Sequence, residues 1–188
     1  QNGHLFYVLT FPTANATWVF DEATQQWHQR AWMDKDGELN RWRPNCITFG
    51  YGMTLAGDWE TGVVYEVSLS QFDDNGDPIP RIRGLPHLVK NGHLVTYPGL
   101  RAYISCGEDP DATAANEPLL SMRWSDDGGH TWSDALMQTM GLAGAYNTQP
   151  YYPALGIGRD RVFELSWANK TGRSLLGVFL DEPLVSNA

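Results

Sequence analysis

The chain has few basic residues, few cysteines and no long apolar run, and each shortage excludes a class of protein. Its 188 residues carry 13 Lys and Arg against 22 Asp and Glu, which gives a formal net charge of −9. A non-specific nucleic-acid binder needs a basic patch that displaces phosphate counterions, so we expect no DNA binding, sequence-specific or otherwise. No apolar segment approaches the ~20 residues of a membrane-spanning helix, so we expect no membrane partner.

The two cysteines, Cys46 and Cys106, do not have the spacing of a metal site. Neither lies in a C-x-x-C pair or near a histidine at ligand spacing, so no zinc site is predicted. We expect two free, buried thiols. A disulfide stays open as an alternative, because sequence does not give the distance between the two sulfur atoms.

The segment Phe72–Pro78, FDDNGDP, spaces its carboxylates like a calcium-binding loop. An EF-hand loop, however, requires glycine at its sixth position and glutamate at its twelfth, where this chain has Pro78 and Gly84. An Asn75–Gly76 hairpin turn is therefore the better interpretation, and we expect no metal or other cofactor.

Helical periodicity is nearly missing, and the segments that remain favour strands. Short runs rich in Val, Ile, Tyr, Trp, Thr and Phe are broken by 19 glycines and 11 prolines as well as Asn and Asp, a pattern typical of an all-β chain. We expect a single β domain over residues 1–188, with a surface loop at 107–118, GEDPDATAANEP. The chain enters a strand-like segment almost at its first residue, so we expect a fragment of a longer protein.

A weak internal repeat predicts the architecture. TWVFDEATQQW and MRWSDDGGHTW each contain a strand, a carboxylate and a tryptophan six residues later, at Asp21 and Trp27 and at Asp126 and Trp132. LAGDWETGVVY, with Asp58, is a looser copy, and FELSWANKTGRSLLGVF suggests a fourth hairpin that turns at Asn169–Gly172. Hairpins repeated at this spacing indicate a propeller-like fold. A blade takes about 40–50 residues, so the chain would form about four blade-like units of a partial propeller.

The segment MRWSDDGGHTW fits the pattern S-x-D-x-G-x-T-W at Ser125, Asp127, Gly129, Thr131 and Trp132. It resembles the Asp-box of sialidases and related propellers, which is a structural hairpin motif usually remote from the catalytic centre. The chemistry of the residues agrees, because glycines supply positive φ, the carboxylate accepts turn amides and the indole is expected to bury its ring. We therefore assign these five residues a structural role.

Neighbouring polar residues of the same segment, Asp126 and His130, are by the same argument not expected to be catalytic. Asp21 and Trp27 form the weaker copy of the turn, with the same structural role expected.

A sialidase-like enzyme remains the alternative from a different functional class. Such an enzyme needs three arginines around a carboxylate, a Tyr–Glu nucleophilic pair and an acidic Asp. The segment PIPRIRGLP offers Arg81 and Arg83, which distantly resemble the family's arginine motif. We keep open a sialidase-like glycosidase or a non-catalytic carbohydrate- or receptor-binding propeller.

Several segments, in order, resemble one family. They are GHLFYVLTFPTANATWVFDEATQQWHQR, GDWETGVVYEVS, DDNGDPIPRIRGLPHL, MRWSDDGGHTWS with the trailing GLAGAY, and GRDRVFELSW. Together they are similar to the C-terminal part of the packaged-DNA stabilisation protein, or tail hub (nozzle), of short-tailed bacteriophages. The similarity extends over nearly all of residues 3–167.

This resemblance implies a structural virion protein without catalytic residues. Such proteins bind below the portal and its adaptor protein after packaging and close the DNA channel. They form a homo-oligomeric ring, expected to be a hexamer, which carries the tailspike or fibre and the needle or plug protein. The implied location is the phage tail in the virion, and the host cytoplasm during assembly.

Overall fold

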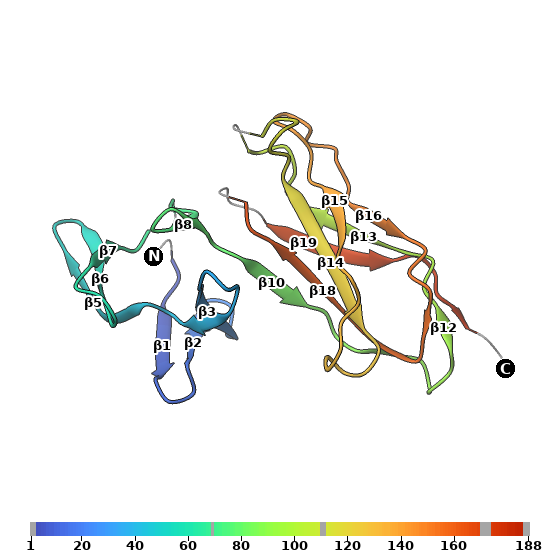
Figure 1. The fold of residues 1–188 in the computed structure, drawn as a ribbon, viewed down its shortest axis with the longest axis horizontal. Coiled ribbons are helices and arrows are strands. Elements are labelled where there is room, and N and C mark those ends of the chain that lie inside the picture. The colour runs from blue at the N-terminus through green and yellow to red at the C-terminus, as the bar shows by residue number, and fades with distance from the viewer. Residues whose placement is uncertain (1–2, 69, 110–111, 170–173, 186–188) are drawn as a thin grey trace. The chain divides into compact units, whose positions relative to one another are not determined.

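The computed structural model describes residues 3–68, 70–109, 112–169 and 174–185, and these residues form strands and turns without a helix. The all-β fold class is therefore confirmed (Figure 1). No helix in this part of the chain is long and apolar enough to span a membrane. Where the sequence indicates one domain over 1–188, the chain divides into two compact units, Gln1–Ile79 (unit 1) and Pro80–Ala188 (unit 2).

Unit 1 consists of antiparallel meanders whose strands follow one another along the chain. Its strands are β1 (Phe6–Phe11), β2 (Ala16–Asp21), β3 (Gln26–Met33), β4 (Leu39–Arg41), β5 (Pro44–Gly50), β6 (Met53–Asp58), β7 (Val64–Glu66), β8 (Asp73–Asp74) and β9 (Asp77–Pro78). They pair in the orders β1-β2-β3-β4, β5-β6-β7 and β8-β9. Sequential meanders are the form of a propeller blade, so this arrangement is consistent with part of a propeller.

Two-residue turns with positive φ connect two of these hairpins. Asn75 and Gly76 have φ values of 54° and 95° between β8 and β9, so the predicted Asn-Gly hairpin turn is confirmed. Tyr51 and Gly52, at 54° and 78°, do the same between β5 and β6. Positive φ at both central residues gives the turn a twist that matches the flanking strands.

The apolar core of unit 1 is small. Among its described hydrophobic residues only Val19 and Ala56 are buried. Guanidinium groups instead stack on aromatic rings at 3.8–5.0 Å, in the pairs Arg30–Phe6, Arg30–Trp42, Arg41–Trp59 and Arg43–Trp32. Each such contact is worth roughly 0.5–2 kcal/mol, depending on its exposure to water, so these stacks replace part of the missing apolar burial.

Unit 2 is built from sheets that join distant segments of the chain. Its strands are β10 (Arg81–Gly84), β11 (Leu88–Val89), β12 (Val95–Thr96), β13 (Gly99–Ile104), β14 (Leu119–Ser125), β15 (Leu136–Thr139), β16 (Tyr151–Pro153), β17 (Ile157–Gly158), β18 (Asp160–Trp167), β19 (Leu175–Leu180) and β20 (Leu184–Val185). One sheet has the order β10-β18-β14-β15, with β11 also on β18, and the others have the orders β16-β13-β19 and β17-β12-β20. All three sheets contribute to one hydrophobic core.

The alternation of side chains along β18 explains how this core forms. Every second residue of the strand is buried, namely Arg161, Phe163, Leu165 and Trp167. Successive side chains of a strand point to opposite faces, so one face of β18 meets the core while the other stays partly exposed. Buried residues of β13 and β14, such as Leu100 and Met122, belong to the same core.

The hairpins predicted around Asp21, Asp58 and Asp126 are present, but the prediction of a fourth hairpin is wrong. Asp21 and Asp58 end β2 and β6, and Asp126 follows β14; these strands pair with β3, β7 and β15. The fourth hairpin requires β18 to pair with β19. In the described part of the chain β18 pairs with β10, β11 and β14, whereas β19 pairs with β13. The chain therefore crosses between two sheets here, and residues 170–173 lie outside the described residues.

Replacing Tyr152 by phenylalanine tests how much the core of unit 2 depends on one buried hydrogen bond. Tyr152 is fully buried, and its hydroxyl donates to the carbonyl oxygen of Leu120 at 2.7 Å. Tyr152→Phe removes the donor and leaves this acceptor in an apolar surrounding, so we expect a loss of about 1–3 kcal/mol in the free energy of unfolding. Denaturant titration measures it. Tyr146→Phe, at an exposed ring of the same unit, is the control and should leave stability unchanged.

Candidate functional site

The five Asp-box residues lie together at the end of β14, where Ser125 is the last residue, and in the turn that follows. The carboxylate of Asp127 accepts hydrogen bonds from the Thr131 amide (2.8 Å), the Thr131 hydroxyl (2.6 Å) and the Ser125 hydroxyl (2.7 Å). The Ser125 hydroxyl oxygen in turn accepts from the amide of Gly129 at 2.8 Å. The sequence folds this way because Gly128 and Gly129 adopt the positive φ values, 73° and 97°, that the turn requires.

These hydrogen bonds also set the ionisation of the Asp127 carboxyl. The Thr131 hydroxyl and amide, followed by the Ser125 hydroxyl, hold its pKa well below the ordinary 3.8. A carboxylate with this environment stays ionised at neutral pH and is engaged by the turn, so it is poorly suited to donate or accept a proton in catalysis.

The tryptophan of the box is less buried than the motif predicts. Trp132 is only partly buried, and the guanidinium of Arg123 lies 4.5 Å from the centre of its ring. Arg123 is held in this place by Glu164, whose carboxylate accepts from Nε at 2.7 Å. The expectation of a buried ring is therefore corrected: the ring is partly exposed, and the guanidinium of an arginine from β14 stacks on it.

Asp126, the neighbour of the box, anchors the turn to the core. Its two carboxylate oxygens accept from Nε (2.6 Å) and Nη2 (2.7 Å) of Arg161, a bidentate pair. Only 2% of Arg161 is exposed. Its remaining donors reach the carbonyl oxygens of Leu155 and Ile157, and its guanidinium stacks on the rings of Tyr97 and Trp124. A buried cation is tolerated when it is paired in this way.

The weaker copy at Asp21, in unit 1, also accepts turn donors, but from the second and third residues after it. The Asp21 carboxylate accepts from the Ala23 amide (3.0 Å) and the Thr24 hydroxyl (3.0 Å), and His4 Nδ1 lies 2.8 Å from Oδ2. Trp27, which the sequence assigns to this copy, packs against Phe20 with 5.2 Å between the ring centres, yet 51% of it remains exposed.

Asp58 is a closer copy of Asp21 than the sequence analysis recognised. Its carboxylate accepts from the Glu60 amide (2.7 Å), the Thr61 hydroxyl (2.9 Å) and Arg43 Nε (2.8 Å). Burial alone would favour the neutral acid, but the hydrogen bonds from Glu60, Arg43 and Thr61 outweigh it and lower the pKa of Asp58 far below 3.8. Its side chain is fully buried.

The turns at Asp21 and Asp58 share the sequence pattern D-x-x-T, which reads DEAT from Asp21 and DWET from Asp58. In each meander the residue after the aspartate also bonds back to the start of the first strand. Glu22 N donates to Leu5 O at 2.9 Å, and Trp59 N donates to Arg43 O at 3.1 Å. A basic side chain from that start, His4 or Arg43, meets the carboxylate in both cases. Unit 1 thus contains one meander design twice.

The arginines considered for a sialidase-like site do not share a role. Arg81 Nη1 donates to the carbonyl oxygen of Asn169 at 3.0 Å, while Arg83 is exposed on β10.

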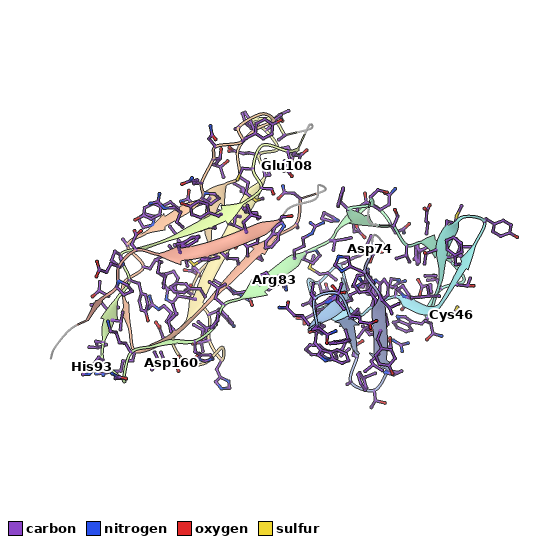
Figure 2. All side chains as sticks on the ribbon, turned by 180° about the vertical axis from the view of Figure 1, so that it is seen from behind. Cys46, Asp74, Arg83, His93, Glu108 and Asp160 are labelled. Atoms are coloured by element: carbon purple, nitrogen blue, oxygen red, sulfur yellow. The ribbon has the colours of Figure 1, made fainter. Side chains whose placement is uncertain are left out.

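Both cysteines are free, but Cys46 is exposed on β5, so its expected burial is wrong. Much of β5 is solvent-exposed. Figure 2 marks Cys46 and Arg83 on their strands. In the described part of the chain no three His, Cys, Asp or Glu side chains are grouped as a metal site.

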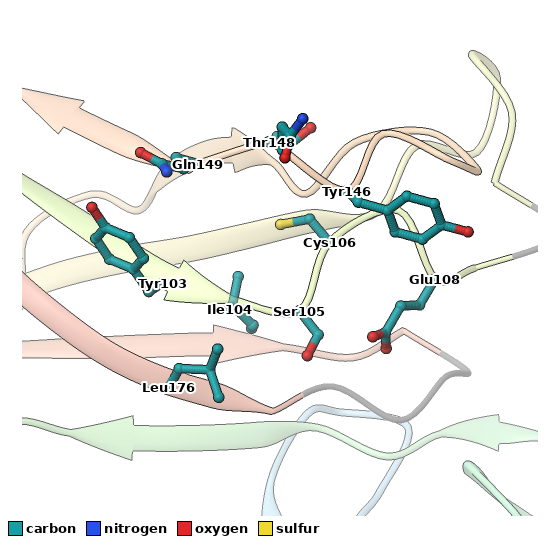
Figure 3. A pocket seen from close by; sticks show the side chains of 10 residues that line it. Tyr103, Ile104, Ser105, Cys106, Glu108, Tyr146, Thr148, Gln149 and Leu176 are labelled. Carbon is teal, nitrogen blue, oxygen red and sulfur yellow. The ribbon is translucent and has the colours of Figure 1, made fainter.

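A pocket of about 280 Å³ lies in unit 2, at the end of β13 (Figure 3). Its lining combines two tyrosines, Tyr103 and Tyr146, with polar side chains that include Glu108, Thr148 and Gln149. The sequence analysis missed this site because its residues come from three separate segments. The one partial signal is GLAGAY, which ends in Tyr146.

Comparison with known proteins gives no match: no protein-family model matches the chain, and neither does any curated protein.

Removing the Asp127 carboxylate tests its role in the turn. Asp127→Ala leaves the Thr131 amide and hydroxyl without their acceptor, so we expect the melting temperature to fall by a few degrees. Asp134→Ala is the matched control, because it removes the same charge from an exposed residue nearby. Equal melting temperatures for the two variants would contradict a structural role.

The depressed pKa of Asp58 predicts an acid-sensitive unit 1. A carboxyl whose pKa is lower in the folded than in the unfolded state contributes stability that is present above pH 3.8 and is lost as the pH falls below it. We expect the protection factors for amide hydrogen exchange in β5–β7, taken relative to the intrinsic exchange rate at each pH, to fall on acidification of the wild type. Asp58→Asn should exchange faster already at neutral pH and respond less to acid. Asp36→Asn, at an exposed carboxylate of the same unit, should behave like the wild type.

Proposed function

We propose that the chain is a non-enzymatic, structural part of the tail hub of a short-tailed bacteriophage and that it acts by assembly. The observation that carries the proposal is that the aspartates of the candidate site form structural hydrogen bonds and an ion pair. Asp127, Asp58 and Asp21 all accept turn donors, and Asp126 is paired with Arg161. These four carboxylates are engaged in holding hairpins, which disfavours a role for them as acids or bases.

Exposed apolar side chains support a role in assembly. In unit 1, Tyr51 at the tip of the β5–β6 hairpin is 95% exposed, and Phe49 beside it is 74% exposed. Aromatic residues are enriched in the buried centres of protein–protein interfaces, so side chains of this kind suit contacts within a ring or with an adaptor, tailspike or needle protein.

The acidic composition fits the same function. A net charge of −9 disfavours tight binding of DNA to a channel wall, because like charges remove the gain from counterion release. DNA has to leave such a channel during ejection, so a wall that does not bind it is suitable.

The second candidate is a carbohydrate-binding or sialidase-like propeller, which the pocket in unit 2 keeps in consideration. A sialidase holds its anionic substrate with a group of arginines. Within the described part of the chain, the residues that line this pocket include no arginine. Binding without turnover is therefore the form of this candidate that the pocket favours.

Deletion of the parent gene from its phage tests the hub function. We expect heads that package DNA, then lose it and lack tails, and we expect the purified parent protein to restore both properties. Electron microscopy and DNA retention measure the outcome. Filled, tailed particles formed without the gene would contradict the proposal.

A substitution in the pocket tests, in the same assay, whether the protein acts by assembly or by catalysis. Glu108 contributes the single carboxylate among the described residues that line the pocket. Parent protein carrying Glu108→Gln should restore DNA retention fully if the protein acts by assembly. If the protein were a glycosidase that depended on this pocket, the variant would fail.

A further inference from the structure

Two glycines allow the loops that form the pocket of unit 2 to approach one another closely. Gly107 has a φ of 71°, and a Cβ atom there would lie 2.7 Å from backbone atoms of Ala145. Gly141 has a φ of 81°, and its Cβ would lie 2.5 Å from Thr148 Oγ1. A side chain at either position would push the loops apart.

Backbone hydrogen bonds complete this loop arrangement. Gly144 N donates to Gly107 O at 2.9 Å, and Gly107 N donates to Met140 O at 3.2 Å. The Thr148 hydroxyl donates to Ala145 O at 2.9 Å. The segment GLAGAY is thereby folded onto the end of β13, so that Tyr146 is positioned at the pocket by the loop itself.

The two tyrosines give the pocket aromatic surface that is open to solvent. Tyr146 is 69% exposed and Tyr103 is 38% exposed. Figure 3 shows their rings toward opposite ends of the pocket, with Cys106 and Thr148 between them and Glu108 on the side of Tyr146. The Tyr103 ring is held by an edge-to-face contact with Phe179, at 5.1 Å between centres, so it is restrained before a ligand arrives.

The polar groups around these rings are hydrogen-bonding groups, and most are neutral. Asn147, Gln149, Thr148 and Ser105 supply amides and hydroxyls, and Glu108 supplies a carboxylate. Amides and hydroxyls both donate and accept, whereas a carboxylate only accepts. A ligand that matches this set carries several hydroxyl groups and an apolar face that stacks on a tyrosine ring.

We propose that this pocket binds a neutral saccharide. Its volume of about 280 Å³ is close to the ~300 Å³ at the lower end of ligand pockets, which suits one or two sugar rings. Among the described residues that line it there is no Lys, Arg or His to attract an anion. The Glu108 carboxylate and the net charge of −9 repel sialic acid and phosphorylated sugars.

Titration of the 188-residue chain with sugars tests the proposal. The probes are neutral monosaccharides (glucose, galactose, mannose, rhamnose and N-acetylglucosamine), their short oligosaccharides, and sialic acid. We expect saturation-transfer NMR to show contact with at least one neutral sugar, with a Kd in the millimolar range, and no contact with sialic acid. Tighter binding of the oligosaccharide than of its monosaccharide identifies a polysaccharide as the source. Equal affinity identifies a free sugar.

Variants test whether the sugar binds in this pocket. Tyr146→Ala removes an exposed stacking surface, so we expect at least a tenfold loss of affinity with an unchanged melting temperature. Glu108→Gln should weaken binding several-fold. Tyr51→Ala removes an equally exposed tyrosine from unit 1 and should bind like the wild type.

Two results would overturn the proposal: no contact with any neutral sugar at tens of millimolar, or contact that Tyr146→Ala and Glu108→Gln leave unchanged. The assay uses isolated protein and measures neither DNA retention nor tail assembly, so its failure is distinct from a failure of the hub proposal.

Discussion

The fold depends on carboxylates that accept the donors of hairpin turns. A chain that folds through hairpins must satisfy the backbone N–H groups of each turn, because an unpaired buried amide is costly. Asp21, Asp58 and Asp127 do this at the ends of β2, β6 and β14. In unit 1 the same carboxylates also bind a basic side chain from the start of the meander, so a single group closes the turn and ties down the first strand. The interaction is local in sequence, which explains how one short motif can be used repeatedly.

The two units use different means to stabilise their sheets. Unit 2 buries a continuous set of apolar side chains, and its buried arginine, Arg161, is satisfied by Asp126, by carbonyl oxygens and by aromatic rings. Unit 1 has few buried apolar side chains, and stacks such as Arg41 on Trp59 take over part of their role. Arginine is suited to both settings because its planar guanidinium can stack and bind a carboxylate at the same time. Much of the arginine in this chain is thereby committed to structure.

The assembly proposal and the saccharide proposal concern different parts of the chain. Assembly is attributed to exposed apolar residues of the hairpins, as at Phe49, whereas saccharide binding is attributed to a pocket formed by loops at one end of a sheet. A virion protein that contacts a sugar without hydrolysing it would need both kinds of surface and no acid–base pair. The glycines at 107 and 141 serve the pocket because, having no side chain, they let its loops approach closely enough for backbone hydrogen bonds to join them.

The sequence by itself determined the local features: the all-β class, the Asn75–Gly76 turn, the hairpins around the aspartates and the period-2 pattern of β18. Each of these follows from residues a few positions apart, whose turn chemistry and alternation act without the rest of the chain. Only the tertiary structure decided that β18 pairs with β10 and β14 and not with β19, that Arg161 is the partner of Asp126, and that loops far apart in sequence form a pocket. These contacts depend on which segments share a core, and strand pairing between distant segments is selected by the packing of all of them together, which no short pattern encodes.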